Sequence, residues 1–151
     1  MATRAVEQSW CVVVPHHASG ARIARHRLAA ELAGAVSPAM LADLVAVLAE
    51  LVGNAVRHAG PLPGGVVRVA WRLRQTPEGP QLRLRVTDGG AAGVPQIRPP
   101  DPDAADGRGL HIVSGLATSW GVERDGLGQS VWADFDPVGD RPALAATGCV
   151  R

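Results

Sequence analysis

One segment of the chain carries both a helix start signal and a helix stop signal. Ser37 is a favourable N-cap residue, Pro38 suits the first helical position, and Gly60 provides the stop. Residues 39–59 contain one glycine and no proline. With helical spacing, the apolar side chains of this segment fall in one arc of roughly 100°; they are Leu41, Leu44, Leu48, Leu51, Val52 and Ala55. The segment predicts one long amphipathic helix, about 38–59, whose apolar face is buried in a core.

Hydrophobic patterns elsewhere in the chain predict further strands and helices. Strands are expected at 10–14, 66–73, 81–88, 120–124 and 130–135, and helices at 19–32 and 107–118. The second and third strands form one antiparallel hairpin, and the last two form another. The first strand is almost continuously apolar, which favours burial of both its faces. These blocks predict an α+β fold, a two-layer α/β sandwich with helices on one face of a mixed, mainly antiparallel sheet.

A chain of 151 residues is expected to form one domain. We expect a flexible lead at 1–8, a single folded domain at 9–136 and a loose tail at 137–151. Residues 89–107 are mostly Gly, Ala, Pro and Asp. A loop of this length in a small domain is usually functional or disordered, so we interpret it as a lid.

All 15 basic residues are arginine, and this excludes several kinds of enzyme. P-loop enzymes and the usual protein kinases need a lysine at the phosphates, and Schiff-base catalysis needs a lysine amine. A net charge of +1 and only four Trp and one Phe argue against direct binding of nucleic acid.

The two cysteines and the apolar runs bear on the cellular compartment. Cys11 and Cys149 fit neither a zinc site nor a redox pair, and we expect Cys11 to be buried. No apolar run reaches the ~18 residues of a membrane span, and the N-terminus lacks a signal-peptide pattern. We therefore expect a cytoplasmic protein with no membrane contact.

Glu50, Asn54 and His58 form a polar line along one shoulder of the apolar helical face. They lie four residues apart, so they are neighbours on successive turns. A polar line at the edge of a core often borders a pocket, although an ordinary solvated flank would have the same spacing. The sequence leaves both interpretations open.

Two glycine-containing segments add to this line. Asp88 ends a predicted strand and precedes Gly89 and Gly90, so it could accept a hydrogen bond from a closely approaching ligand, or it could simply form a turn. The segment 107–110 (GRGL) opens a predicted helix, where backbone N–H groups can bind an anion. Glycines there could equally serve only to permit the turn.

Taken in order, residues 50–58 (ELVGNAVRH), 86–90 (VTDGG) and 107–110 (GRGL) resemble the N box and the two glycine boxes of the GHKL ATPase superfamily. The later segments 110–113, 117–122 and 128–132 are also similar to this family, and to the bacterial anti-sigma-factor serine kinases in particular. The likeness covers about residues 9–135. It implies a Bergerat fold in which ATP lies between helices and lid, so that 9–136 would be the ATP-binding domain.

The resemblance implies a role for each matching residue. Asn54 would coordinate Mg²⁺ through its amide oxygen, and Glu50 would be the general base that takes the proton of the attacking hydroxyl. Asp88 would accept a hydrogen bond from the adenine amino group, with Gly90 letting the base lie close. Ser130 stands where the family usually has a threonine near the adenine.

Further matches concern the phosphates. Gly107, Gly109 and Leu110 would hold them through backbone N–H groups, and Arg108 is the nearest cation that could clamp them. Arg57 and His58 would lie near the ribose or phosphate, and a structural role is equally open for His58. Two positions depart from the family pattern: Ala92 replaces a glycine of the first glycine box, and Gln129 replaces a frequent lysine.

The resemblance implies a regulator that transfers a phosphoryl group from ATP to a serine of a small antagonist of the STAS type, and that also sequesters a sigma factor. A second hypothesis keeps ATP binding but makes the domain a nucleotide-gated partner-binding module without catalysis. A third, a detached catalytic domain of a histidine kinase, is weaker because no dimerisation helix precedes the N box. Relatives often pair, which leaves a homodimer open.

Overall fold

The computed structural model describes residues 6–90, 105–126 and 128–137, and every predicted helix and strand is present in it. The predicted flexible lead overlaps the first strand by two residues, which corrects its boundary. The elements in chain order are β1 (Glu7–Pro15), α1 (Ala18–Leu32), α2 (Pro38–His58), β2 (Val66–Thr76), β3 (Gly79–Asp88), α3 (Ala105–Leu116), β4 (Ser119–Asp125) and β5 (Gly128–Phe135).

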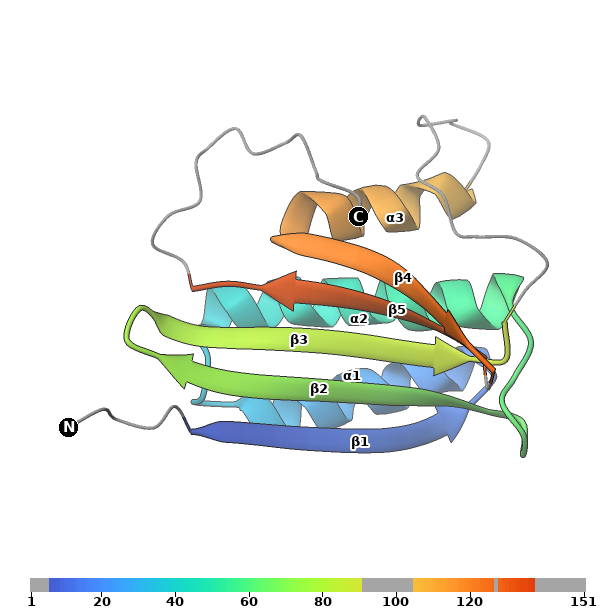
Figure 1. Cartoon of the computed structure of the whole chain (residues 1–151), viewed down its shortest axis with the longest axis horizontal. Helices are drawn as coiled ribbons and strands as arrows, with labels where there is room; N and C mark the ends of the chain where they lie inside the picture. The colour runs from blue at the N-terminus through green and yellow to red at the C-terminus, as the bar shows by residue number, and fades with distance from the viewer. Residues whose placement is uncertain (1–5, 91–104, 127, 138–151) are drawn as a thin grey trace.

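The five strands form one sheet in the order β1-β2-β3-β5-β4. α1 and α2 lie on one side of this sheet, behind it in the view of Figure 1, and α3 packs against α2 near β4 at the top of the view. The predicted α+β two-layer sandwich is therefore confirmed. All pairings among the described strands are antiparallel. The prediction of a mixed sheet is therefore corrected to an antiparallel one.

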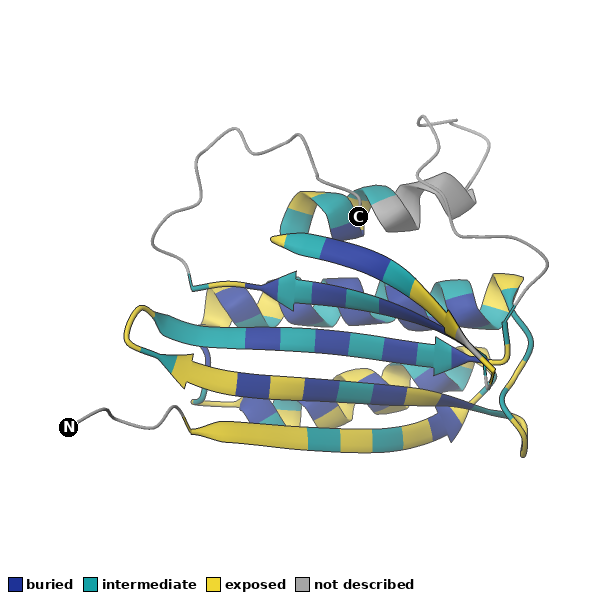
Figure 2. Ribbon diagram, viewed as in Figure 1, coloured by how far each residue is buried: buried dark blue, intermediate teal, exposed yellow. Residues whose placement is uncertain are grey.

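α2 is the central helix, packed between α1 and α3 and against β3 and β5. Ser37 accepts a hydrogen bond from the Met40 backbone N–H, which confirms the predicted N-cap. Most of the predicted apolar arc is buried, with Leu41 half-buried and Met40 and Val47 added. On the sheet, buried and exposed residues alternate along β2, as Figure 2 shows. The core therefore fills the space between this helical face and one face of the sheet.

β1 corrects two expectations. It pairs only with β2 and is the edge strand of the sheet, and most of its residues are exposed or half-buried, with Val14 alone buried. Cys11 is exposed rather than buried. The sequence pattern alone could not show this exposure, because an apolar strand has the same pattern at the edge of a sheet and at its centre. Its position in the sheet decides how many neighbours cover it.

α2 is also long and apolar enough to cross a membrane by length and composition, with a mean hydropathy of 1.8 over its most apolar window. Among the described helices it is the one that meets this test. Its buried face packs against the sheet and its neighbours are α1 and α3, which is the arrangement of a core helix.

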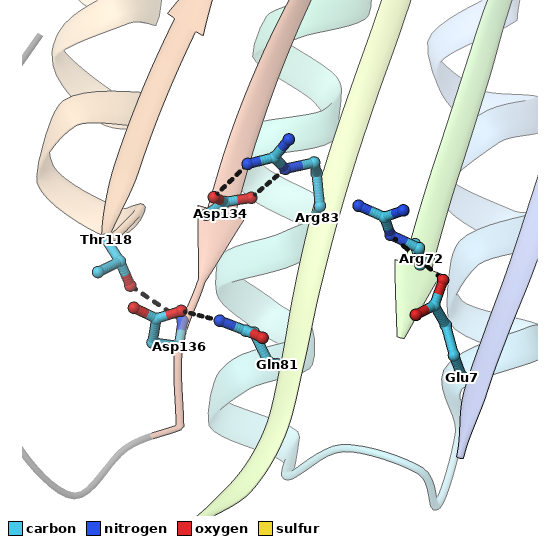
Figure 3. Close-up of polar contacts among 7 residues, drawn as sticks. All are labelled: Glu7, Arg72, Gln81, Arg83, Thr118, Asp134 and Asp136. Carbon is cyan, nitrogen blue, oxygen red and sulfur yellow. Dashed lines mark hydrogen bonds and ion pairs between the residues drawn. The ribbon is translucent and has the colours of Figure 1, made fainter. Parts of the chain in front are cut away.

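The other face of the sheet carries arginines paired with acids on neighbouring strands. The Arg83 guanidinium binds Asp134 through two hydrogen bonds of 2.6 and 2.8 Å and lies 4.5 Å from the centre of the Trp132 ring. The hydrogen bond to Asp134 raises the pKa of Arg83 above its usual value. Arg72 pairs with Glu7 at 3.6 Å (Figure 3). These pairs neutralise much of the basic charge of this face within the sheet itself.

We expect Leu48→Ala to reduce the free energy of unfolding by roughly 2–5 kcal/mol, because it removes buried methyl groups and leaves a cavity. Leu48 is fully buried in the middle of α2. Ile23→Ala on α1 is the matched control, since its side chain is 45% exposed. It should change stability by no more than about 0.5 kcal/mol. Urea unfolding measures both, and equal effects would contradict the central role of α2.

Candidate functional site

The polar line on α2 lies where the helix leaves the core. Glu50 and Asn54 are half-buried, and His58 is exposed at the end of the helix. The Asn54 Oδ1 atom accepts a hydrogen bond of 3.2 Å from Arg57 Nη2. The Arg57 guanidinium also covers Gly53, where a Cβ would stand 2.9 Å from its Nη1. The one glycine inside α2 therefore leaves room for the arginine that contacts Asn54.

Asp88 ends β3 with a tight side-chain turn. Asp88 is 3% exposed, and its Oδ1 accepts a hydrogen bond of 2.7 Å from the Gly90 backbone N–H. An ionised carboxylate has about four acceptor positions, so this contact leaves capacity for a ligand. Burial raises the pKa of the Asp88 carboxyl, while the Gly90 N–H bond and the charge of His16 oppose that rise. The turn thus presents a recessed hydrogen-bond acceptor.

Two backbone hydrogen bonds join the end of α2 to this turn. The Gly60 N–H donates to the Gly90 carbonyl at 3.1 Å, and the Gly89 N–H donates to the Gly60 carbonyl at 2.8 Å. A side chain on Gly89 would overlap the Pro61 carbonyl, so only glycine fits there. Gly90 has a φ of 90°, and a Cβ on it would meet none of the described residues within 4 Å. Within the described part of the chain, the space beside Gly90 is therefore open.

The structure does not bring Ser130 to Asp88. Ser130 pairs with Thr87 in the sheet, and their hydroxyl oxygens are 2.7 Å apart. Because paired residues share a face and neighbours alternate, both point away from the face of Asp88. This corrects the predicted place of Ser130 at the adenine.

Gln129 takes the place beside Asp88, its partner in the sheet. It is buried, and its Oε1 accepts a hydrogen bond of 3.0 Å from Arg124 Nε on β4. The sequence contained a signal for the face of Gln129 but not for its pairing with Asp88, because Gln129 alternates with Val131, Ala133 and Phe135, which are buried on that face.

His16 is a second residue that the sequence analysis missed. Its ring Nε2 lies 3.0 Å from the Ala55 carbonyl oxygen and 2.7 Å from the Ala59 carbonyl oxygen, at the end of α2. It precedes α1 in the chain and lies 39 residues or more from these partners. No local pattern in the sequence indicates such a contact.

The second glycine box lies at the start of α3. The helix begins at Ala105, two residues earlier than predicted, so residues 107–110 lie within its first two turns. The side chains of Arg108 and Leu110 lie outside the described residues. The same holds for most of the predicted lid, including Ala92, and for the predicted tail from residue 138 onward.

The residues present fit the groups that the sequence predicts. A planar base with an amino group suits a recessed carboxylate beside an open glycine turn. Among the described residues, no cluster of three or more His, Cys, Asp or Glu side chains could hold a metal. Asn54 offers one amide oxygen, and that oxygen has a second lone pair beside the one used by Arg57. This suits Mg²⁺, which keeps several waters and takes other ligands from phosphates.

The chain belongs to the histidine kinase-like ATPase domain family, because the model of that family matches residues 14–135. The match runs from the end of β1 to the end of β5 and includes α2 and the Asp88 turn. Membership of an ATPase family implies a site for ATP. No match was found among the curated proteins.

A solved structure has a similar fold. It is the crystal structure of the RsbU and RsbW domains of Rv1364c from Mycobacterium tuberculosis, with a TM-score of 0.59 and 21% sequence identity. The match covers 85% of this chain and 31% of that chain. This chain therefore spans about a third of the length of the solved one, and the likeness concerns the fold.

We expect Asp88→Asn to change how stability depends on pH. Because burial raises the pKa of Asp88, the folded state binds its proton more tightly than the unfolded state does. Wild-type stability therefore falls as pH rises from the ordinary aspartate pKa of about 3.9 through the raised value. The variant lacks this loss, so its stability relative to wild type should increase over that interval and then stay constant.

Urea unfolding at a series of pH values measures this difference. The exposed Asp136→Asn is the control for removing a carboxylate elsewhere. A stability difference between Asp88→Asn and wild type that did not change with pH would contradict the effect of burial.

Proposed function

We propose that the chain is an ATP-binding regulator of the anti-sigma-factor type. It transfers the γ-phosphoryl group of ATP to a serine of a STAS-type antagonist and, in its other state, holds a sigma factor. The observation that carries this proposal is the family match over 14–135 together with Glu50 and Asn54 on the helix that joins the Asp88 turn. The likeness to the structure containing an RsbW domain supports the regulatory class.

In the proposed site, Asp88 accepts a hydrogen bond from the adenine amino group, and the base lies over Gly90, where no described residue would contact a Cβ. Gln129 borders the base from β5, in place of Ser130. The free N–H groups in the first turn of α3, which includes Gly107, bind the phosphates, with Gly109 and Leu110 in the following turn and Arg108 as the cation. Arg57 and His58 lie toward the ribose or phosphates. Asn54 holds Mg²⁺, which neutralises phosphate charge when bound.

Glu50 is the proposed general base. It accepts the proton of the serine hydroxyl while the serine oxygen bonds to the γ-phosphorus and the bridging oxygen leaves with ADP. Glu50 is half-buried on the flank of α2, so part of its side chain is accessible to a substrate. A pure binding module has no need of a base at this position. We further propose that the protein works in the cytoplasm, without direct contact to nucleic acid or membrane, and a homodimer stays open as its assembly.

We expect Asn54→Ala to weaken ATP binding at least tenfold in the presence of Mg²⁺, because the amide oxygen for the metal is lost. Alanine is the better helix former, so the variant should be at least as stable as wild type. Calorimetric titration measures the affinity and thermal unfolding measures the stability. Unchanged ATP affinity with Mg²⁺ present would overturn the metal assignment.

We expect Glu50→Gln to keep ATP affinity but to slow phosphotransfer about 10²–10⁴-fold, since the amide cannot take the serine proton. Incubation with labelled ATP and candidate STAS proteins, scored for phosphoserine, measures this. Glu78→Gln, in the exposed turn between β2 and β3, is the control. A Glu50→Gln variant as active as wild type would remove the base role. Nucleotide-dependent partner binding without any phosphotransfer by wild type would instead favour the binding module.

A further inference from the structure

His16 sits where three parts of the fold meet. It lies in the connection between β1 and α1, and its backbone N–H donates to the Gly65 carbonyl, just before β2, at 3.0 Å. Its half-buried ring reaches the last turn of α2, where Nε2 is 3.0 Å from the Ala55 oxygen and 2.7 Å from the Ala59 oxygen. The side chain therefore ties the edge of the sheet to the end of the central helix.

The chemistry of these contacts assigns the ring hydrogen. A backbone carbonyl oxygen only accepts hydrogen bonds, so Nε2 must carry a hydrogen that is shared between the two carbonyls. The Ala55 carbonyl also accepts the Ala59 backbone N–H at 3.2 Å, whereas the last carbonyls of a helix have no N–H partner within the helix. The negative end of the helix dipole also favours a donor there. His16 thus completes the C-terminal turn of α2 from a distant part of the chain.

A short series of hydrogen bonds leads from this turn to Asp88. Ala59 is followed by Gly60, which exchanges two backbone bonds with Gly89 and Gly90. The Gly90 N–H then donates to the Asp88 carboxylate. The charge of His16 also acts on Asp88, where it opposes the effect of burial on the pKa of that carboxyl. His16 is therefore linked to Asp88, the acceptor proposed for adenine, both through hydrogen bonds and through its charge.

We infer that His16 is a positioning residue for the base-binding turn: its Nε2–H holds the last turn of α2, which in turn holds Gly60, Gly89 and Gly90 so that the Asp88 carboxylate faces the adenine amino group. This inference rests on the proposed ATP site. It predicts that loss of the His16 donor removes the contact to the 6-amino group and leaves the contacts to ribose and phosphates.

A matched pair of variants isolates the donor. The amide nitrogen of Gln can occupy the place of Nε2, whereas the shorter side chain of Asn falls nearer the place of Nδ1 and does not reach the carbonyls. His16→Gln and His16→Asn are therefore both neutral amides that differ in this one donor. His17→Asn is the control, because His17 is the exposed N-cap of α1 and Asn is also a good N-cap.

The probes are ATP and the triphosphate of purine riboside, which lacks the 6-amino group, and calorimetry gives the affinity for each with Mg²⁺. We expect wild type, His16→Gln and His17→Asn to prefer ATP by about tenfold. His16→Asn should lose this preference and bind both nucleotides as wild type binds the analogue.

The possible results separate the two proposals. If His16→Asn keeps the full preference, or His16→Gln loses it, the positioning role is overturned while the ATP site stands. If wild type itself shows no preference, the Asp88 contact fails, and with it the role of His16. Thermal unfolding checks that each variant is folded at the assay temperature. If His16→Asn is unfolded at the assay temperature, His16→Gln is used alone. A His16→Gln variant that keeps the preference for ATP supports the role of the donor, and one that loses it overturns that role.

Discussion

The packing of α2 against the sheet is the constraint on which the rest of the molecule depends. Its apolar face is buried against β3 and β5, and α1 and α3 pack along its sides. Burial of that face sets the rotation of the helix, because any other rotation would expose Leu44, Leu48 and Val52. With the rotation set, Glu50 and Asn54 come to the edge of the core. One hydrophobic interaction thus organises both the fold and the helix flank that carries Glu50 and Asn54.

The far end of α2 shows how polar contacts complete what packing begins. Hydrophobic burial is not directional, so it cannot orient a single carboxylate. The paired bonds of Gly60 with Gly89 and Gly90, and the contact of His16 with the helix end, supply that direction. Burial of Asp88 has a cost in stability, because it removes the carboxylate from water and raises its pKa. A recessed carboxylate of this kind destabilises the ligand-free protein and is suited to a ligand that donates a hydrogen bond.

Most of the fold could be predicted, and the reason differs from element to element. α2 has a cap, a stop and a full apolar face, so its bounds were predicted within one residue. The hairpins follow from alternation and turn residues. β1 was different, because its apolar run says nothing of its place at the sheet edge. Among the site residues, Ser130 was predicted near the adenine, whereas strand register puts Gln129 and not Ser130 opposite Asp88.

By itself, the sequence determined which residues form helices and strands, which helical face is apolar, and which family motifs occur in order, since these depend on neighbours within a few positions. Tertiary structure alone decided the edge position of β1, the register that sets Gln129 opposite Asp88, and the reach of His16 to the end of α2. Those features join residues far apart in the chain. Their geometry depends on how whole elements pack, and no local pattern encodes it.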